Sequence, residues 1–336
     1  MAVEDVIKEV REAAKSVISD TIEFTDVRVE ASNVVLYTKN VDVFAENSDM
    51  VRKLAQKVRK RILVRADPSV RLPSKEAEEK LREVIPSEAE ISSVRFDEIN
   101  GDVYIEAVNP GRAIGKFGAV LNEVRRAVGW NPIVIRDAPM ESKTLREIRN
   151  FVLEPKVAKK RRDFMTRVGR KVFRDTIEGE QYVRLTALGG YREVGRSCHL
   201  LMTKDSKVLV DCGFNPGNEK EPSPFLNAPE VTPLDGLDAV VLTHAHLDHS
   251  ALLPMLFVYG YDGPVYCTPP TRDLAALLQT DYIKIQNAEA KKVPYSSKHI
   301  RQQVQNCIPL NFGDTTDIAP NLKLTLHNSG HILGSA

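Results

Sequence analysis

The sequence predicts an α/β protein with two small α/β domains in tandem, over residues 1–69 and 70–140. A basic helical connector over 141–178 and a layered α/β domain from residue 179 are expected to follow. Three observations support this organisation. The order of elements in the first part of the chain repeats once, a dense run of basic residues comes next, and short β-rich segments then alternate with helices. A length of 336 residues suits two or three compact units.

The first unit begins with apolar residues at helical spacing over residues 4–19. Two alternating runs, FTDVRVEA and NVVLYTKNVDVF, predict strands. The segment MVRKLAQKVRKR places Val51, Leu54 and Val58 on one helical face, and ILVRADP predicts a closing strand that Pro68 ends.

The second unit has the same order of elements. A helix is expected over SKEAEEKLREVI, strands over ISSVRFDEI and GDVYIEAV, a helix over GAVLNEVRRAVG and a strand over PIVIRDAP. The pairs VRV and VRF, and LVRADP and VIRDAP, match between the two copies, so we infer an internal repeat of about seventy residues.

The net charge of +1 conceals a strong local asymmetry. Residues 156–174 carry nine Lys or Arg residues and one Asp, whereas the segment SKEAEEKLREVIPSEAE is acidic. The basic run is either a solvated helical face or a track for a nucleic-acid backbone. The charged, amphipathic N-terminus resembles no secretion signal and no later stretch is long enough to span a bilayer, so we expect a soluble, cytoplasmic protein without membrane contact.

The last unit contains the β-rich segments SCHLLMT, KVLVDCG, AVVLTH, PVYCTPP and LKLTLHNSGH, with helices such as TRDLAALLQTDYIKIQ between them. Its four cysteines form no CxxC pair, so neither a zinc ribbon nor a disulfide framework is indicated. The chain stops at Ala336, directly after GHILGSA, without a closing element. We therefore expect a fragment of a longer protein, with an incomplete last domain.

A dense cluster of metal-binding residue types lies in LTHAHLDHSALL, residues 242–253. The buried strand AVVLT is expected to end at His244, and the helix SALLPMLFVYG to follow the cluster. Imidazole nitrogens and carboxylate oxygens suit Zn²⁺ at about 2.0–2.2 Å. We expect His244 and His246 to share one ion, and Asp248 and His249 to face a second, as in two-metal sites that hydrolyse phosphodiesters.

Two further residues are candidates for the same site. His331, in HNSGHILGSA, is expected at the end of an alternating strand, and His327 on that strand is expected to be structural. Asp211 follows the strand KVLV, where it either forms a turn before Gly213 or orients a metal ligand by a hydrogen bond, which we favour. We expect metal binding by His244, His246, Asp248, His249 and His331, and catalytic roles for Asp211, His246 and Asp248.

A second motif, Gly115, Lys116, Phe117 and Gly118, precedes the second helix of the second repeat. A GxxG turn at a helix start lets a phosphate backbone approach closely, and Lys116 adds positive charge. The order helix, strand, strand, GxxG, helix, strand is that of a type II KH domain, which grips single-stranded RNA. A simple helix-entry turn is the alternative. The first repeat has NSDM, residues 47–50, at this place, so we expect that degenerate copy to act as a spacer or a weaker platform.

The motifs LGGYREVGRSC, VLVDCGFNPG, LTHAHLDHSALLP, LLQTDYIKIQN and NSGHILGSA, in this order, resemble the metallo-β-lactamase portion of the β-CASP nucleases. With two preceding KH-like domains, the chain resembles the archaeal branch of the cleavage-and-polyadenylation-specificity-factor-like group. By motif, Asp211 matches the first acidic residue, residues 244, 246, 248 and 249 match the second motif, and His331 matches the third.

The resemblance implies an αββα fold, two Zn²⁺ ions in the full-length protein and hydrolysis of single-stranded, often U-rich RNA. It also implies homodimers and action on transcripts attached to RNA polymerase, with its elongation factors, in RNA 3′-end formation and transcription termination. Endonuclease activity is expected, with 5′–3′ exonuclease activity as a further possibility. The family has further ligands, which would lie beyond Ala336, so we expect this chain alone to bind metal weakly and to cleave poorly.

Two other functions remain open at this point. A small-molecule (thio)ester hydrolase of the metallo-β-lactamase type shares the HxHxDH motif, and a non-catalytic RNA-binding adaptor could retain an inactive metal fold. The KH-like pair disfavours the first alternative, and the intact ligand positions disfavour the second.

Overall fold

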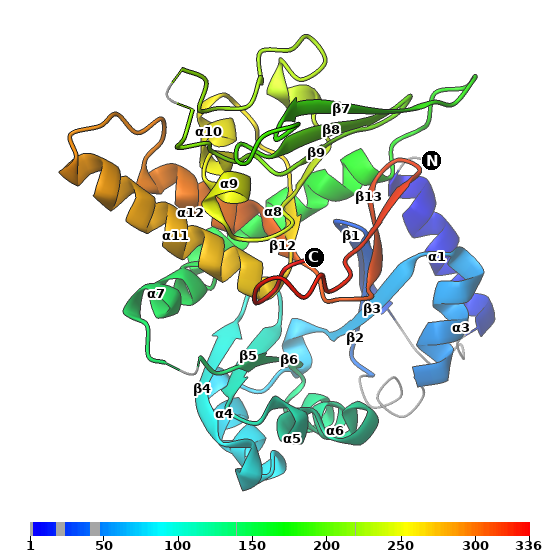
Figure 1. Ribbon diagram of the computed structural model, residues 1–336. Coiled ribbons are helices and arrows are strands. Elements are labelled where there is room, and N and C mark those ends of the chain that lie inside the picture. Colours follow the sequence, from blue (N-terminus) through cyan, green and yellow to red (C-terminus); the bar gives the residue numbers. More distant parts are fainter. Residues whose placement is uncertain (1–2, 18–23, 41–47, 139, 219) are drawn as a thin grey trace. The chain divides into compact units, whose positions relative to one another are not determined.

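The computed structural model describes residues 3–17, 24–40, 48–138, 140–218 and 220–336. The chain divides into two compact units, which we describe separately (Figure 1). The first unit comprises Met1–Lys143 and Leu153–Arg170, and the second comprises Thr144–Val152 and Lys171–Ala336. The four domain ranges expected from the sequence therefore remain predictions.

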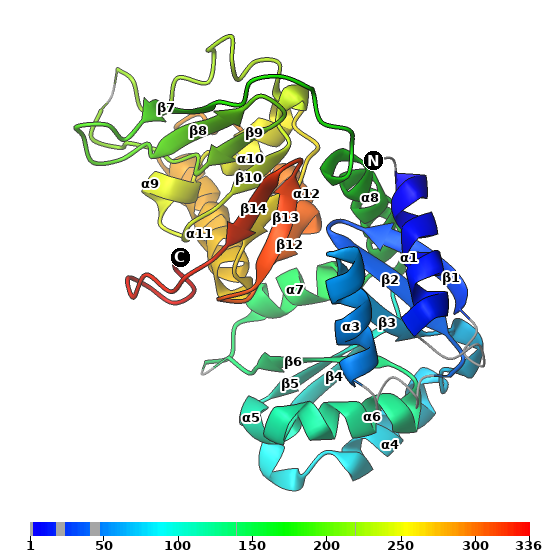
Figure 2. The ribbon, with the colours of Figure 1, turned by 90° about the vertical axis from the view of Figure 1, so that its right-hand side faces the viewer.

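The first repeat contains α1 (Val3–Val17), β1 (Phe24–Glu30), β2 (Asn33–Thr38), α3 (Ser48–Val58) and β3 (Arg61–Ala66). Strands β1 and β2 are antiparallel, β2 and β3 are parallel, and the sheet order is β1-β2-β3. Helices α1 and α3 pack together beside this sheet (Figure 2). The predicted strand residues 41–44, and Asn47 of the NSDM stretch, lie outside the described residues.

The second repeat contains α4 (Ser74–Val84), β4 (Ile91–Asp97), β5 (Asp102–Ala107), α5 (Pro110–Ile114), α6 (Ala119–Val128) and β6 (Asn131–Arg136). Short 3₁₀ turns η1 (Pro68–Val70), η2 (Ser87–Ala89) and η3 (Lys116–Gly118) join these elements. The sheet order β4-β5-β6, with one antiparallel and one parallel pair, reproduces that of the first repeat. The two copies expected from the sequence are therefore confirmed.

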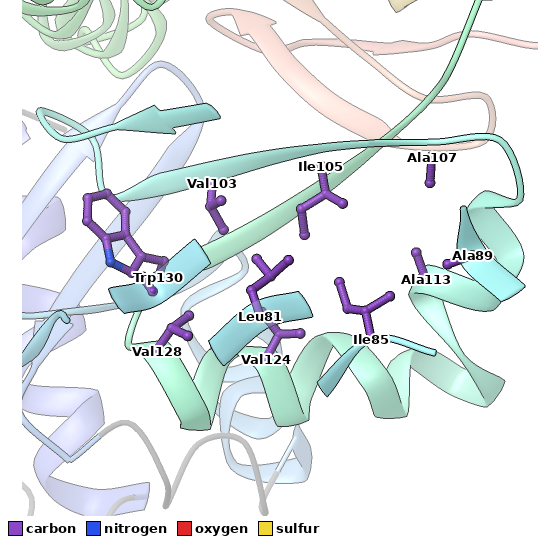
Figure 3. Packing of buried hydrophobic residues seen from close by; sticks show 11 residues of the cluster. Leu81, Ile85, Ala89, Val103, Ile105, Ala107, Ala113, Val124, Val128 and Trp130 are labelled. Carbon is purple, nitrogen blue, oxygen red and sulfur yellow. The ribbon is translucent and has the colours of Figure 1, made fainter. Parts of the chain in front are cut away.

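The core of the second repeat lies between its sheet and helices α4 and α6 (Figure 3). Leu81 and Val124 from the helices meet Val103 and Ile105 from β5, and all four side chains are fully buried. The buried residues of this core recur every three to four positions in the helices and every second position in the strand, so one face of each element is apolar. Trp130 closes one end, where its indole N–H donates to the carbonyl of Leu72 at 2.9 Å.

The connector forms α7 (Lys143–Phe151) and α8 (Pro155–Val172). Pro155 occupies the first position of α8, where the missing N–H costs no intrahelical hydrogen bond. None of the helices within the described residues is both long and apolar enough to cross a membrane.

The second unit contains a six-stranded sheet of order β12-β11-β10-β9-β8-β7 and a hairpin, β13-β14. Its strands are β7 (Val183–Gly189), β8 (Cys198–Thr203), β9 (Lys207–Val210), β10 (Ala239–Val241), β11 (Val265–Cys267), β12 (Cys307–Pro309), β13 (Thr315–Ala319) and β14 (Leu322–Thr325). Its helical elements are η4 (Leu234–Gly236), α9 (Leu247–Ser250), α10 (Leu253–Val258), α11 (Pro269–Ala288) and α12 (Ser297–Asn306). Strands β9 to β12 are parallel, so their carboxyl ends share one edge of the sheet.

Two elements of this unit differ from the sequence-based expectation. The helix expected over SALLPMLFVYG is shortened to α10, and a separate short helix, α9, ends at Ser250. Pro254 has no N–H to donate, and the N–H of Leu252 bonds the carbonyl of Cys212 at 2.9 Å, so no helix runs through Ala251 and Leu252. Strand β14 ends at Thr325, so His327 and His331 lie in a loop and not on a strand. Gly330 turns this loop in the left-handed region, at φ 72°, and its N–H bonds the side chain of Asn328 at 2.8 Å.

Candidate metal centre and GKFG loop

The HxHxDH turn follows β10 and is fixed by backbone hydrogen bonds from a neighbouring segment. Ser197 N donates to Asp248 O, and Cys212 N donates to His249 O, both at 2.8 Å. Gly213 packs directly against the turn, since a Cβ atom at this glycine would lie 1.6 Å from the Asp248 carbonyl oxygen. The backbone that carries the four candidate ligands is therefore held from outside the turn itself.

A second segment brings His331 to the turn. Ala336 N donates to Thr243 O at 3.0 Å, and the hydroxyls of Thr268 and Thr271 donate to Gly334 O at 2.7 and 2.9 Å. The Ser335 hydroxyl accepts from the N–H of His331 at 3.2 Å. These bonds tie the loop to the carboxyl ends of β10 and β11. They explain why His331, which lies outside any helix or strand, has a defined position.

The ligand atoms of His244, His246 and His331 all lie within 4.8 Å of one another. His331 Nε2 and His246 Nδ1 are 3.1 Å apart, and the His244 ring lies 5.0 Å from each of the other two ring centroids. Two neutral imidazole nitrogens at such a distance repel unless a proton or a cation lies between them. Three converging nitrogens of this kind fit the donor set of a zinc ion, with a coordination position left for another ligand.

His249 and Asp248 form a second group beside the first. The rings of His244 and His249 are 4.1 Å apart, and His249 Nε2 lies 3.6 Å from Asp248 Oδ2. His249 Nδ1 is already bound to Asp211 Oδ2 at 2.7 Å. Because Nδ1 is used in this way, Nε2 of His249 and the Asp248 carboxylate are the groups that can hold a cation here.

Asp211 is buried, 2% exposed, and links the two groups of histidines. Its carboxylate accepts from Thr243 N at 2.9 Å, from the Thr243 hydroxyl at 3.0 Å and from His249 Nδ1. Gly213 N donates elsewhere, to Ser197 O, so the structure shows no Asx turn between Asp211 and Gly213. This geometry suits the hydrogen-bonding role that we favour for Asp211 over a turn-forming one.

The Thr243 hydroxyl fixes the orientation of His244. It lies 3.0 Å from His244 Nδ1 as well as 3.0 Å from the Asp211 carboxylate. The carboxylate can only accept, so the single hydroxyl proton goes to Asp211 and the hydroxyl oxygen accepts the Nδ1–H of His244. The Nε2 lone pair of His244 is then directed to the cluster. The sequence reasoning missed Thr243, although its place between the strand and the first histidine was a usable signal.

The environment changes the pKa values of two histidines in opposite directions. Burial, reinforced by the neighbouring histidines, lowers the pKa of His244 to about 4. Burial also disfavours the charged form of His249, but the hydrogen bond and charge of Asp211, with the charge of Asp248, raise its pKa overall. At neutral pH the His244 ring is therefore neutral, so a cation does not compete with a proton at that nitrogen.

The GKFG loop belongs to the first unit, and we describe it by itself. Gly115, Phe117 and Gly118 adopt left-handed conformations, at φ 73°, 53° and 79°. A Cβ atom at Gly115 would lie 2.6 Å from Val120 Cγ2, so the turn requires glycine there. Phe117 is 95% exposed, and Lys116 Nζ lies 5.6 Å from the centre of its ring. An aromatic face and a cation are thus presented to solvent at a helix start.

Comparison with known proteins assigns a class to the first repeat and to most of the second unit. Residues 4–71 match the family described as the KH domain of transcription termination factor FttA. Residues 200–336 match the metallo-β-lactamase superfamily domain. The chain therefore combines a KH domain with a metallo-β-lactamase domain, as the sequence analysis expected.

Archaeal relatives match the chain along its length, and all three named here carry the name transcription termination factor FttA. The relative from Methanosarcina mazei is 47% identical over 100% of this chain and 52% of its own length. Those from Thermococcus kodakarensis and Lokiarchaeum are 43% and 40% identical over 99% and 100% of this chain, and again 52% of their own lengths. The chain thus spans about half the length of these relatives, and the resemblance to the archaeal group is confirmed.

Replacement of Thr243 tests the link between Asp211 and His244. Thr243→Val removes the hydroxyl with little change of shape, so His244 loses its Nδ1 partner and zinc affinity should fall about 10- to 100-fold. Thr243→Ser keeps the hydroxyl and should stay within about threefold of the wild type. Competition with a chromophoric chelator measures both affinities. Equal zinc binding by the Val variant would show that Thr243 does not orient His244.

Replacement of Gly213 tests the support of the turn. In Gly213→Ala the new methyl group would overlap the Asp248 carbonyl, so we expect the free energy of unfolding to fall by about 3 kcal/mol and zinc binding to weaken. The control is Gly217→Ala, whose Cβ would meet nothing nearer than Asn215 Oδ1 at 3.4 Å. Urea unfolding should place the control within about 0.5 kcal/mol of the wild type. Equal stabilities of the two variants would contradict the close packing.

Proposed function

We propose that the protein is a zinc-dependent ribonuclease that cleaves single-stranded RNA. The observation that carries this proposal is the convergence of His244, His246 and His331 within 4.8 Å, next to Asp248 and His249. Imidazoles and a carboxylate in two adjoining groups suit two Zn²⁺ ions better than a single structural ion, because structural sites are closed tetrahedra. Zinc ions bound there would act as Lewis acids on a phosphodiester and lower the pKa of water at the site.

The protein's own residues have separate parts in this proposal. His244, His246 and His331 would hold one ion, and Asp248 with His249 would hold the other. Asp211 takes no ligand position, since its oxygens are occupied by Thr243 and His249, and it keeps both histidines in the required tautomer. Asp248 is the most exposed acid of the site, at 36% of its side chain, and is therefore the carboxylate most accessible to a substrate.

The match of residues 4–71 to a KH domain, and the same sheet order in the second repeat, support RNA as the substrate. In the GKFG loop, the exposed ring of Phe117 can stack on a base, and Lys116 can pair with a phosphate. By analogy with its relatives, we propose action in transcription termination and RNA 3′-end formation, on transcripts attached to RNA polymerase. U-rich sites, elongation factors as partners, a homodimer, added 5′–3′ exonuclease activity and a cytoplasmic location belong to the same proposal.

Removal of one metal ligand tests the catalytic part. His246→Ala should reduce cleavage of a labelled single-stranded RNA about a hundredfold or more, because the ligand set loses a nitrogen, and EDTA should abolish the remaining activity. The matched control is His327→Ala, an exposed histidine in the same loop as His331, and it should cleave like the wild type. The zinc content of both variants is measured in parallel.

The outcomes of this experiment separate the alternatives. Thioester hydrolysis that depends on His246, without RNA cleavage, would favour the small-molecule hydrolase. RNA binding by the full-length protein without hydrolysis of either substrate would favour the adaptor. RNA cleavage that survives the loss of His246 and treatment with EDTA would refute the zinc site as its origin.

Replacement of Phe117 tests the RNA-binding part. Phe117→Ala removes the exposed ring from the GKFG loop, and RNA affinity should fall about 5- to 100-fold if a base stacks there. Val108→Ala, at another exposed apolar residue of the same repeat, should leave the affinity unchanged. Fluorescence anisotropy with labelled single-stranded RNA measures both dissociation constants. Equal losses in the two variants would contradict a specific role of the loop.

A further inference from the structure

Helix α8 has a buried face that fixes it to both repeats of the first unit. The buried side chains of this face recur at helical spacing and comprise Val157, Ala158, Phe164 and Val168. The carbonyl of Met165 accepts the backbone N–H of Ala31 at 2.8 Å, and a Cβ atom at Gly169 would lie 2.5 Å from the nearest side-chain atom of β1. Arg162 donates to the carbonyl of Ile99, in the second repeat, at 2.8 Å. The orientation of α8 within this unit is therefore fixed.

The opposite face of α8 carries a basic stripe. Its members are exposed and follow one another at intervals of three or four positions, so they line one side of the helix: Lys156, Lys160, Asp163, Arg167 and Arg170. Lys159 is exposed beside them. The stripe runs over residues 156–170, which is about 21 Å at the rise of an α-helix. Because the helix is held from its other face, these side chains form a fixed linear array.

The basic side chains of the stripe are not paired with acidic neighbours. Among the described residues, no carboxylate forms an ion pair with any of them. The acidic helix α4 shows the contrast. Its Arg82 pairs with Glu78 at 2.9 Å, and its Lys80 pairs with Glu83 at 3.0 Å. Like charges three or four positions apart destabilise a helix, and two pairs of the stripe have this spacing. A bound polyanion would offset this repulsion.

We propose that the stripe binds the phosphate backbone of single-stranded RNA without preference for its bases. Lys and Arg side chains on a rigid helix face pair with phosphates, and such contacts carry no sequence information. The basic run of the sequence is thus a nucleic-acid track on one face of α8 and a structural element on the other. RNA is favoured over other polyanions because residues 4–71 of the same unit match a KH domain. The inference rests on RNA as the substrate in the proposed function.

The salt dependence of RNA binding tests the stripe. A triple variant with Lys156→Gln, Lys160→Gln and Arg167→Gln removes three phosphate contacts, and each contact contributes about 0.7 to the slope of log K against log salt for a single strand. The slope should therefore fall by about 2, which makes binding about 100-fold weaker at about 0.1 M KCl and close to that of the wild type near about 1 M. Fluorescence anisotropy of the full chain, in EDTA to prevent hydrolysis, measures the slopes. Labelled oligo(U) and oligo(A) should show the same change.

The matched control removes three charges from the acidic helix of the same unit. Lys75→Gln, Lys80→Gln and Arg82→Gln change the net charge of the protein by the same amount and should leave the slope unchanged. A charge-conserving variant, Lys156→Arg with Lys160→Arg, should keep the wild-type slope. All substituted side chains are exposed, so the melting temperatures of these variants should stay near that of the wild type.

The outcomes separate the stripe from the proposed nuclease. An unchanged slope in the stripe variant, or equal changes in the stripe and control variants, would overturn the stripe alone and make it a solvated face. A change of slope with duplex DNA but not with RNA would also overturn it, with DNA as the occupant. Absence of RNA binding by the wild type would overturn both proposals. The expected slopes without RNA cleavage by the zinc-loaded wild type would support the stripe and contradict only the nuclease.

Discussion

The buried carboxylate of Asp211 is the interaction on which the candidate metal centre depends. One oxygen accepts the backbone N–H of Thr243, and the other accepts both the Thr243 hydroxyl and His249 Nδ1. A carboxylate with three donors is stable in a buried position, whereas an aliphatic substitute would leave those donors unpaired. The same group therefore sets the backbone after β10, the tautomer of His249 and, through Thr243, the tautomer of His244. Asp211 itself is held at φ 61°, a conformation that the surrounding bonds must maintain.

The parallel strands explain why so many chemical groups meet in one place. Strands β9, β10 and β11 all end at the same edge, and they are followed by Asp211, Thr243 and Thr268 respectively. The loop that carries His331 has no strand of its own at this edge, but it bonds to Thr243 and Thr268. Both groups of histidines are thus positioned by the same strand ends. Their spacing therefore depends little on the more distant parts of the unit.

Local patterns predicted most of the elements and the identity of the clustered residues. The repeat, the KH-like order and the HxHxDH turn follow from periodicity and motif spacing, which depend only on neighbours in the chain. Effects of distant contacts were missed. The helix after the turn starts only at Leu253 because Leu252 bonds Cys212, and the strand before His331 is short because its loop is held by Ser335, Thr243 and Thr268.

The backbone bonds from Ser197 and Cys212 to the HxHxDH turn have a consequence for the apo protein. In small zinc-dependent domains the ion supplies the free energy that organises its own ligands. Here hydrogen bonds within the sheet and its loops supply that organisation, so a cation bound there would meet candidate ligands that already have their spacing. Binding would then require little loss of conformational freedom, and the fold would persist whether or not the site is occupied.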